Sequence, residues 1–376
     1  MLESGRLAET WRSRRWDSFC LVTPNSAVLL PGAPYSGPDP DGFMTLDELI
    51  QHFETWAETF RPPVLKETAV SRLEPAPNDE WTITLEDESI HARSVVVATG
   101  SYQTAHRPKG ADALTASVQQ LLAEEYRNPD RLPPGAALIV GSGQTGCQLA
   151  EELHQAGRTV FLSCGRCPWF PRRADDGRDT VLWMNESGFV DRTPEVLSSP
   201  AARLVGNPQA SGHGGGHDLH FRTLHAMGVE LLGRYAGAEG PTVHFADDLA
   251  ASVDFGDARW AELRAYMDAY CKRAGKAAPR YPPVEPMRIK TRSELDLVRE
   301  GVGSVIWTAG YRPDYRWVKA PVFDDLGFPI QTDGQTEAPG LYFVGVHWMR
   351  KQKSAILYGV GEDAQVVAEQ IASPPR

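Results

Sequence analysis

The chain has 376 residues, of which 41% are hydrophobic, and its formal charge at pH 7 is −11. At roughly 100–200 residues per domain, this length predicts two or three domains with sizeable cores. The acidic balance argues against a general binder of nucleic acid or of anionic membranes. No apolar run approaches the ~20 residues of a membrane span, and the first residues lack the apolar core of a signal peptide.

The chain carries five cysteines, an odd and sparse set. Such a set fits a reducing compartment better than a disulfide framework, so we expect a cytoplasmic protein. Cys164 and Cys167 form a CxxC pair. One interpretation of this pair is a redox disulfide and the other is two incidental thiols. We favour the second, because the pair follows the strand expected at the adenosine end of a nucleotide.

Capping and alternation patterns predict the first regular elements. Thr45, followed by Glu48, forms a capping box for a helix through about Phe60. Residues 81–85 alternate apolar with polar side chains, as in a half-buried strand. Residues 92–100 are predicted to be the second strand of that hairpin, ending in Ala-Thr-Gly.

The region from 168 to 240 is irregular, with a helix predicted near 219–227 that Asp218 would cap. Asp257 is predicted to cap another helix with a broad apolar face. The remaining predicted elements are two buried strands and a final helix, at 304–307, 341–344 and 362–372.

His213, His217 and His220 flank three consecutive glycines, a spacing that by itself allows a metal site. No cysteine or carboxylate pattern of the zinc type accompanies them. We therefore expect a glycine turn here and no metal.

The most informative motif runs from Gly141 to Gly146, between an apolar stretch and an amphipathic one. Strand, glycine turn and helix in this order predict the start of a dinucleotide-binding unit. Gly141 allows the tight turn, Gly143 lets the backbone approach a pyrophosphate, and Gly146 lets the helix pack on its strand. The helix N-terminus, with Gln144 and Thr145, offers N–H groups to the phosphates.

The second strand of this unit, 159–163, predicts the coenzyme. An acid at its end would bind the ribose hydroxyls of NAD, but Ser163 and Arg166 stand there, with Arg172 close behind. A guanidinium suits a 2′-phosphate through charge-assisted bonds. The pattern therefore favours NADPH, although solvated loop charges remain the alternative interpretation.

Several stretches, taken in order, resemble the flavin-containing monooxygenase-like family, in the branch that includes the YUCCA enzymes. They are Glu9–Ser18, Leu30–Gly32, Asp39–Phe43, Val97–Gly100, Gly141–Gly146, Gly165–Arg172, Ile306–Pro313 and Gly359–Ala364. The resemblance covers essentially the whole chain.

The resemblance implies an α/β fold with two dinucleotide-binding, Rossmann-like domains, the NADP domain being inserted into the FAD domain. Residues 1–135 would be the first part of the FAD domain, 136–310 the NADP domain and 311–376 the C-terminal part of the FAD domain. Gly100 and Gly310 would end the two crossover strands.

Two departures from the family pattern stand out. The chain opens at about the family's second strand, so that roughly thirty residues with the glycine loop for the FAD pyrophosphate are expected to be absent. The family also has a fingerprint, FxGxxxHxxxY, before the NADP motif. Aligned on Tyr126, its four fixed positions are Ala116, Val118, Leu122 and Tyr126 in this chain, so only the tyrosine remains. This second departure weakens the case for oxygen insertion.

The resemblance implies FAD and NADP as cofactors, and O2 and a small molecule with a nitrogen, sulfur or carbonyl group as substrates. One oxygen atom would pass from O2, through a C4a-peroxyflavin, to that substrate. Neither nucleic acid nor a membrane is expected as a partner, and the oligomeric state stays open. The residues that the resemblance assigns to FAD are Glu3, Trp11, Arg12, Val70, Gly345, Gly361 and Asp363.

No general acid or base is certain, and the pocket candidates are Asp17, Gln103 and His347. Two alternative functions stay open at this stage. One is an NADPH-dependent flavin oxidoreductase without oxygen insertion, and the other is a flavin-free NADPH-binding protein.

Overall fold

A computed structural model describes residues 1–115 and 117–373. Its larger sheet has five parallel strands in the order β11-β10-β9-β15-β8. The order reverses direction between β9 and β15, which is the switch point where open α/β sheets bind ligands. The strands are β8 (Gln119–Leu122), β9 (Ala136–Val140), β10 (Val160–Ser163), β11 (Glu230–Leu232) and β15 (Val302–Trp307).

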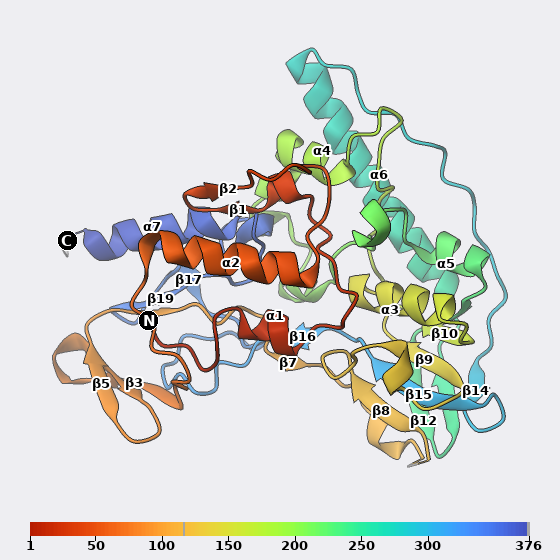
Figure 1. Ribbon diagram of the computed structural model, residues 1–376, viewed down its shortest axis with the longest axis horizontal. Helices are drawn as coiled ribbons and strands as arrows, with labels where there is room; N and C mark the ends of the chain where they lie inside the picture. The colour runs from red at the N-terminus through yellow and green to blue at the C-terminus, as the bar shows by residue number, and fades with distance from the viewer. Residues whose placement is uncertain (116, 374–376) are drawn as a thin grey trace.

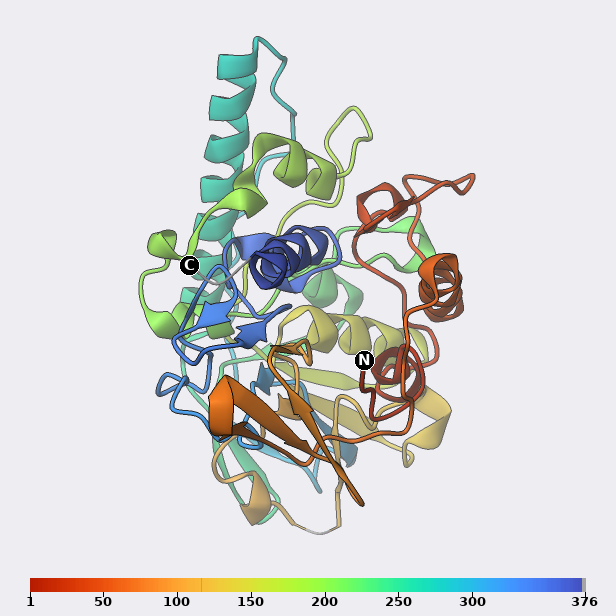
Figure 2. The same ribbon diagram turned by 90° about the vertical axis from the view of Figure 1, so that its left-hand side faces the viewer.

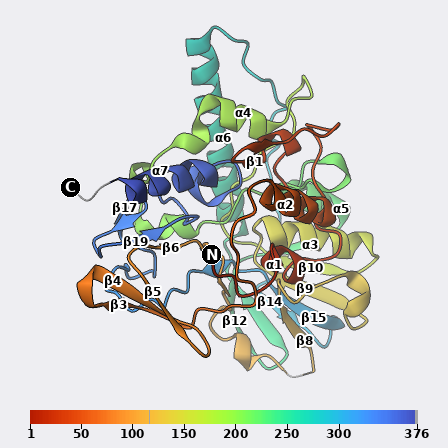
Figure 3. The ribbon, with the colours of Figure 1, turned by 60° about the vertical axis from the view of Figure 1, so that its left-hand side comes forward.

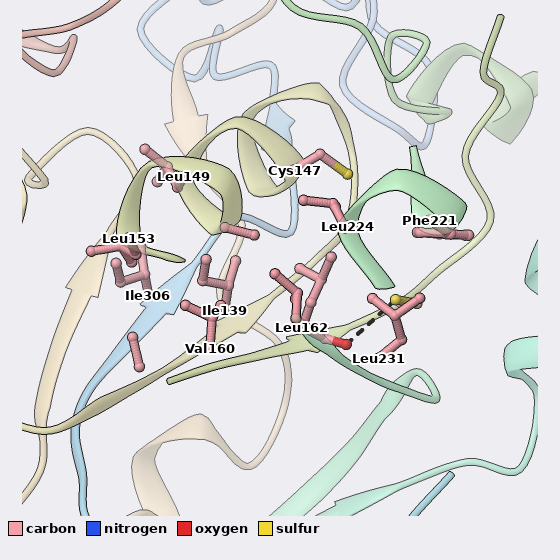
Figure 4. Packing of buried hydrophobic residues seen from close by; sticks show 14 of the residues in the cluster. Ile139, Cys147, Leu149, Leu153, Val160, Leu162, Phe221, Leu224, Leu231 and Ile306 are labelled. Carbon is pink, nitrogen blue, oxygen red and sulfur yellow. Dashed lines mark hydrogen bonds between the residues drawn. The ribbon is translucent and has the colours of Figure 1, made fainter. Parts of the chain in front are cut away.

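Every residue of β9 is buried, as its continuous apolar sequence requires of a central parallel strand. Helices α3 (Gln144–Gln155) and α5 (Phe221–Met227) cover one face of the sheet (Figure 4). There, Leu149 and Leu153 of α3 pack against Ile139 and Ile306. An antiparallel sheet covers the other face; it consists of β12 (Tyr235–Glu239), β13 (Thr242–Phe245) and β14 (Glu294–Asp296).

A second sheet joins the two ends of the chain. In it β6 (Val95–Val97) pairs in parallel with β19 (Leu341–Phe343), and β18 (Gln335–Thr336) and β17 (Gln331–Thr332) follow. Figure 1 shows the consequence: the two ends of the chain gather on one side and the middle of the chain on the other. The fold is therefore α/β with two Rossmann-like halves, and this prediction is confirmed.

The predicted hairpin at 81–100 is correct only in its first part. An antiparallel sheet of β3 (Arg72–Ala76), β4 (Glu80–Thr84) and β5 (Ser89–Ala92) ends at Ala92, and β6 belongs to the parallel sheet instead. All three valines of β6 pair in parallel with β19, although only Val97 among them is buried.

The first residues of two helices test the predicted N-caps at Thr45 and Asp257. Helix α2 (Leu46–Phe60) has the expected capping box, with Thr45 and Glu48 bonded to each other's backbone. Helix α6 (Leu249–Ala274) projects from both sheets (Figures 2 and 3) and begins before Asp257, so the predicted cap is wrong. Gly256 lies inside the helix, where a side chain would collide with the ring of Trp169. Asp257 accepts a hydrogen bond from the indole N–H of that tryptophan.

The remaining helices are short or lie at the ends: α1 (Glu9–Ser13), α4 (Thr180–Ser187) and α7 (Val360–Ala372). The start of α5 also differs from the prediction, because His220 and not Asp218 is its N-cap residue. The Asp218 carboxylate accepts a hydrogen bond from the backbone N–H of Arg172 instead. Of the helices described, none is both long and apolar enough to cross a membrane.

Candidate functional site

The glycine turn between β9 and α3 has the geometry of a phosphate cradle. Gly141 has φ +112°, and a Cβ there would lie 2.5 Å from the carbonyl oxygen of Thr308. A Cβ on Gly146 would collide with the carbonyl of Gly141, whereas a Cβ on Gly143 would have no neighbour within 4 Å. Gly141 and Gly146 thus serve packing, and Gly143 leaves the N-terminus of α3 open to an anion.

Thr308 connects this turn to the end of β15. Its hydroxyl donates a 2.6 Å hydrogen bond to the carbonyl of Gly141, across the switch point of the sheet. The segment 207–210 lies over the turn, because Gln209 donates to the carbonyl of Ser142 and Gln144 to that of Pro208. Gln144 is therefore held by protein, and Thr145 is half-buried.

The end of β10 offers one free cation. Arg166 is exposed, and no carboxylate that the structure describes pairs with it. Ser163 is buried and donates to the carbonyl of Gly233, while Arg172 is 1% exposed and ion-paired to Asp179 at 2.6 Å. Ser163 and Arg172 are therefore closed to a ligand, and their predicted contacts with a 2′-phosphate are wrong.

The carboxyl ends of β6, β15 and β19 converge close to this turn. Gly100 and Gly345 both have positive φ, and a Cβ on Gly100 would lie 4.0 Å from the Gly345 carbonyl. The hydroxyl of Tyr315 donates to the carbonyl of Gly100 at 2.7 Å. Strands β7 (Thr104–Ala105) and β16 (Tyr311–Arg312) then pair, so the two crossover segments, one ending at Gly310, run side by side.

Side chains from five segments gather near these strand ends in a cluster that we call the recess. Its residues are Arg15, Tyr102, Asn207, Tyr311 and His347. The Tyr102 ring lies 4.4 Å from that of His347 and 5.7 Å from that of Tyr311, centroid to centroid. The amide of Asn207 donates to the Tyr102 hydroxyl at 3.1 Å.

Tyr102 is 41% exposed, yet burial raises the pKa of its hydroxyl. Burial also lowers the pKa of His347 to about 4, so its imidazole is neutral at pH 7. Both side chains therefore face the recess as neutral hydrogen-bonding groups.

Arg15 is the residue of the recess that sequence reasoning missed. Its guanidinium lies 4.8 Å from the centre of the Trp11 ring, and burial lowers its pKa. Arg12 was predicted for this position, but it ion-pairs with Glu54 of α2. Helix α1 ends at Ser13, and the chain after it places the Arg15 guanidinium over the ring of Trp11. In the sequence, the only sign of this cation–π contact is that the two residues are four positions apart.

Two other residues assigned to FAD lie together at the start of the chain. The carboxylate of Glu3 accepts a hydrogen bond from the backbone N–H of Gly5. The backbone carbonyl of Glu3 accepts one from the backbone N–H of Thr68. Val70 is half-buried against the core around β3 and β4.

The two assigned residues on α7 are more enclosed. Pro31 lies against Gly361, within 3.1 Å of where a Cβ would be. Asp363 is buried and accepts from Arg350 at 3.2 Å, and burial raises its pKa.

The three pocket candidates differ in position. His347 lies in the recess, as described above. Gln103 holds the two crossover segments together, donating to Thr99 and accepting from the backbone of Asp314. Asp17 is exposed and accepts from the side chain of Asn128 at 2.6 Å, so it lies outside the recess.

The fingerprint residues flank the end of β8. Leu122 ends that strand and is half-buried, so this position brings no polar group. Tyr126 is buried, and its pKa is raised by burial. Position 116 lies outside the described residues.

Two cavities lie away from the recess, and no residue of the recess lines either of them. One, of about 400 Å³, lies between α6 and the segment 284–288. The other, of about 230 Å³, lies between α3 and the segment 16–20. We assign the functional site to the recess, because the strand ends and the glycine turn converge there.

The chain is similar to several known oxidoreductases. The pyridine nucleotide-disulphide oxidoreductase family matches residues 39–182. An uncharacterized CzcO-like oxidoreductase of Geobacillus kaustophilus is 29% identical, over 98% of this chain and 89% of its own length. Flavin-containing monooxygenase 5 of Oryctolagus cuniculus is 28% identical, over 43% of this chain and 34% of its own.

The fold is shared with a solved structure, a mutant flavin monooxygenase from Stenotrophomonas maltophilia. Its TM-score is 0.63 at 18% identity, and the match covers 96% of this chain and 86% of that one. This chain is thus similar in sequence to oxidoreductases and flavin-containing monooxygenases, and similar in fold to a flavin monooxygenase. The turn at Gly141–Gly146 and the recess are the parts of the candidate site that the structure brings together.

Proposed function

We propose that the chain is an NADPH- and FAD-dependent monooxygenase that acts on a small substrate with a nitrogen, sulfur or carbonyl group. The observation that carries this proposal is the bond between Thr308 and Gly141. It ties the nucleotide turn to the strand whose end opens on the recess. A nucleotide bound at the turn would thus have its far end directed to the recess.

The geometry of the turn fits NADPH. The open Cβ direction at Gly143 leaves space for a pyrophosphate at the N-terminus of α3. The exposed guanidinium of Arg166 is free to bind a 2′-phosphate with two parallel hydrogen bonds.

The flavin would lie at the ends of β6 and β19. There, Gly100 and Gly345 allow close approach of a ligand, and Trp11 with Arg15 forms one wall. Glu3 and Val70 are proposed for the adenosine end, and Gly310, Gly361 and Asp363 for the flavin end. The proposed limits of the domains stay at 1–135, 136–310 and 311–376, although β8 joins the larger sheet from before residue 136.

FAD, when bound, would supply the electron transfer and the activation of O2. The residues of the recess would bind and orient the substrate and exclude water. The hydroxyl of Tyr102 can donate a hydrogen bond into the recess, because Asn207 already donates to its oxygen. His347 is neutral, so it would position a reacting group and would not serve as a cationic acid.

The coenzyme part of the proposal is tested with Arg166→Ala. This change removes a charge-assisted contact worth on the order of 1.5–3 kcal/mol, so the Kd for NADPH should rise at least tenfold and that for NADH should barely change. Titration of the purified protein with each coenzyme measures both values. Arg173→Ala, in the following loop, is the matched control. Equal losses for the two coenzymes would show that Arg166 does not bind the 2′-phosphate.

Oxygen insertion is tested separately with isotopically labelled O2. Label in the product supports a monooxygenase. The half-buried Leu122 at the family's histidine position favours a second candidate, an NADPH-dependent flavin oxidoreductase without oxygen insertion. NADPH consumption with no label in any product would select that candidate.

A further inference from the structure

Away from the recess, one face of helix α3 borders the smaller cavity, between this helix and the segment 16–20. Its volume of about 230 Å³ is below the roughly 300–1,000 Å³ of pockets for drug-sized ligands. Gln148, Glu151 and Glu152 line it from α3, at positions three and four residues apart that share one side of a helix. Trp16 lines it from the segment 16–20.

This face of α3 offers hydrogen-bond acceptors that no described residue uses. Glu151 is 5% exposed; its Oε1 lies 2.6 Å from Nε2 of His217, but its Oε2 has no hydrogen bond. Oε2 of Glu152 is buried without a partner, and burial raises the pKa of that carboxyl. The side-chain N–H of Gln148 donates to the carbonyl of Ala210 at 3.4 Å, which leaves its oxygen as an acceptor. Buried acceptors without donors are unfavourable, so the face is complementary to a ligand rich in N–H groups.

The lining favours an organic cation over a metal ion. Two carboxylates line the cavity, and no lysine or arginine does. Among the described residues, no three histidine, cysteine or carboxylate side chains are placed to hold a metal ion. Acceptors spread along a helix face suit a planar guanidinium, which has five N–H donors in a fork. Trp16, which is 5% exposed, adds an aromatic wall of the kind on which guanidinium groups stack.

We propose that this cavity is a second binding site and takes a small guanidinium compound, with Glu151 and Glu152 as its acceptors and Trp16 as its wall. The site lies on the helix that begins at the glycine turn, but none of its lining residues belongs to the turn or to the recess. The proposal is therefore independent of the proposed function and of the reaction at the recess.

Two matched probes, 1-butylguanidinium and 1-butylurea, test the proposal, because they have nearly the same shape and differ in charge. Their binding to the full chain is measured by isothermal titration calorimetry at neutral pH and constant ionic strength. The wild type should bind the guanidinium at least about tenfold more tightly than the urea, because charge-assisted hydrogen bonds are roughly twice as strong as neutral ones.

Three variants locate the binding. Glu152→Gln keeps the shape of the side chain and removes its charge, so the affinity for the guanidinium should fall about tenfold while that for the urea stays unchanged. Gln148→Met removes an acceptor at constant charge and should weaken the guanidinium several-fold, so the test does not depend on one variant. Glu58→Gln, on the exposed surface of α2, is the matched control and should keep the preference, because a distant exposed charge is screened.

Equal binding of the two probes to the wild type would overturn the proposal. So would a preference that survives in both Glu152→Gln and Gln148→Met, or a loss in Glu58→Gln as large as that in Glu152→Gln, which would reduce the effect to the overall negative charge. The titrations are repeated with saturating NADP. If NADP abolishes binding of the guanidinium, the probe occupies the coenzyme turn and the proposal fails, whereas unchanged binding supports a separate site.

Discussion

Arg166 and Arg172 are close in the sequence but have opposite environments. Arg166 is exposed on the loop after β10, whereas Arg172 lies under the ring of Phe43, at 4.3 Å, and pairs with Asp179. Burial lowers the pKa of Arg172 and raises that of Asp179, so each charge depends on the other. At the residue scale, the same kind of side chain is thus open to solvent in one place and part of the core in the other.

Asp179→Asn should destabilise the protein by about 3–5 kcal/mol, because it leaves the buried Arg172 without a counter-ion. The asparagine oxygen can still accept the capping hydrogen bond from Val181, so the loss would report on the charge. Unfolding in urea measures the change. Asp254→Asn, in an exposed pair with Arg288, is the control and should change little. Similar losses in both variants would contradict this account of Arg172.

At the scale of elements, one ion pair attaches the glycine-rich loop around residue 214 to helix α3. Nε2 of His217 lies 2.6 Å from Oε1 of Glu151, which is 5% exposed. The hydrogen bond to Glu151 is the largest cause of a raised pKa at His217, and burial opposes it. The histidine cluster that suggested a metal by spacing thus includes a loop-to-helix contact.

Stability should therefore depend on pH through His217. Because its pKa is raised on folding, the contribution is complete below the unfolded value of about 6.5 and is lost as the pH rises through the folded value. His217→Gln should lose this part of the pH dependence, so its Tm should approach that of the wild type as the pH rises above neutrality. Thermal melts between about pH 5.5 and 8.5 measure it. A constant difference in Tm across this range would exclude the ion pair as the cause.

At the scale of the whole molecule, a charge cluster joins the two sides of the structure. Lys353 is 7% exposed and lies 2.8 Å from Asp191 and 2.9 Å from Glu362 of α7. Lys351 contacts the same two acids, and Arg192 bonds to Gln352. The cluster connects the turn after α4, in the middle of the chain, to the start of α7, near its C-terminal end.

Lys353→Met should weaken this connection by roughly 1–3 kcal/mol, allowing for the partial exposure of both acids. We expect the single calorimetric transition to broaden or split, because the two halves would unfold less cooperatively. Lys351→Met is the control, and its effect should be smaller, since that side chain is more exposed. An unchanged transition in Lys353→Met would show that the cluster does not couple the halves.

The sequence predicted correctly those elements whose conformation depends on residues close together in the chain. The glycine turn, the capping box at Thr45 and the buried strands 136–140 and 341–343 follow from neighbouring residues alone. The cap at Asp257 and the long strand 92–100 were wrong, because Trp169 and the pairing of β6 with β19 decided those positions from far along the chain.

The site divides in the same way. The sequence by itself determined the glycine turn at 141–146, because backbone conformation is a local property, and it singled out Arg166, whose role stays a prediction. Only the tertiary structure decided that Arg172 is buried, that Arg12 pairs with Glu54, and that Tyr102 packs against His347. The physical reason is that solvation and ion pairing depend on which segments meet in space, and the recess is built where five segments of the chain converge.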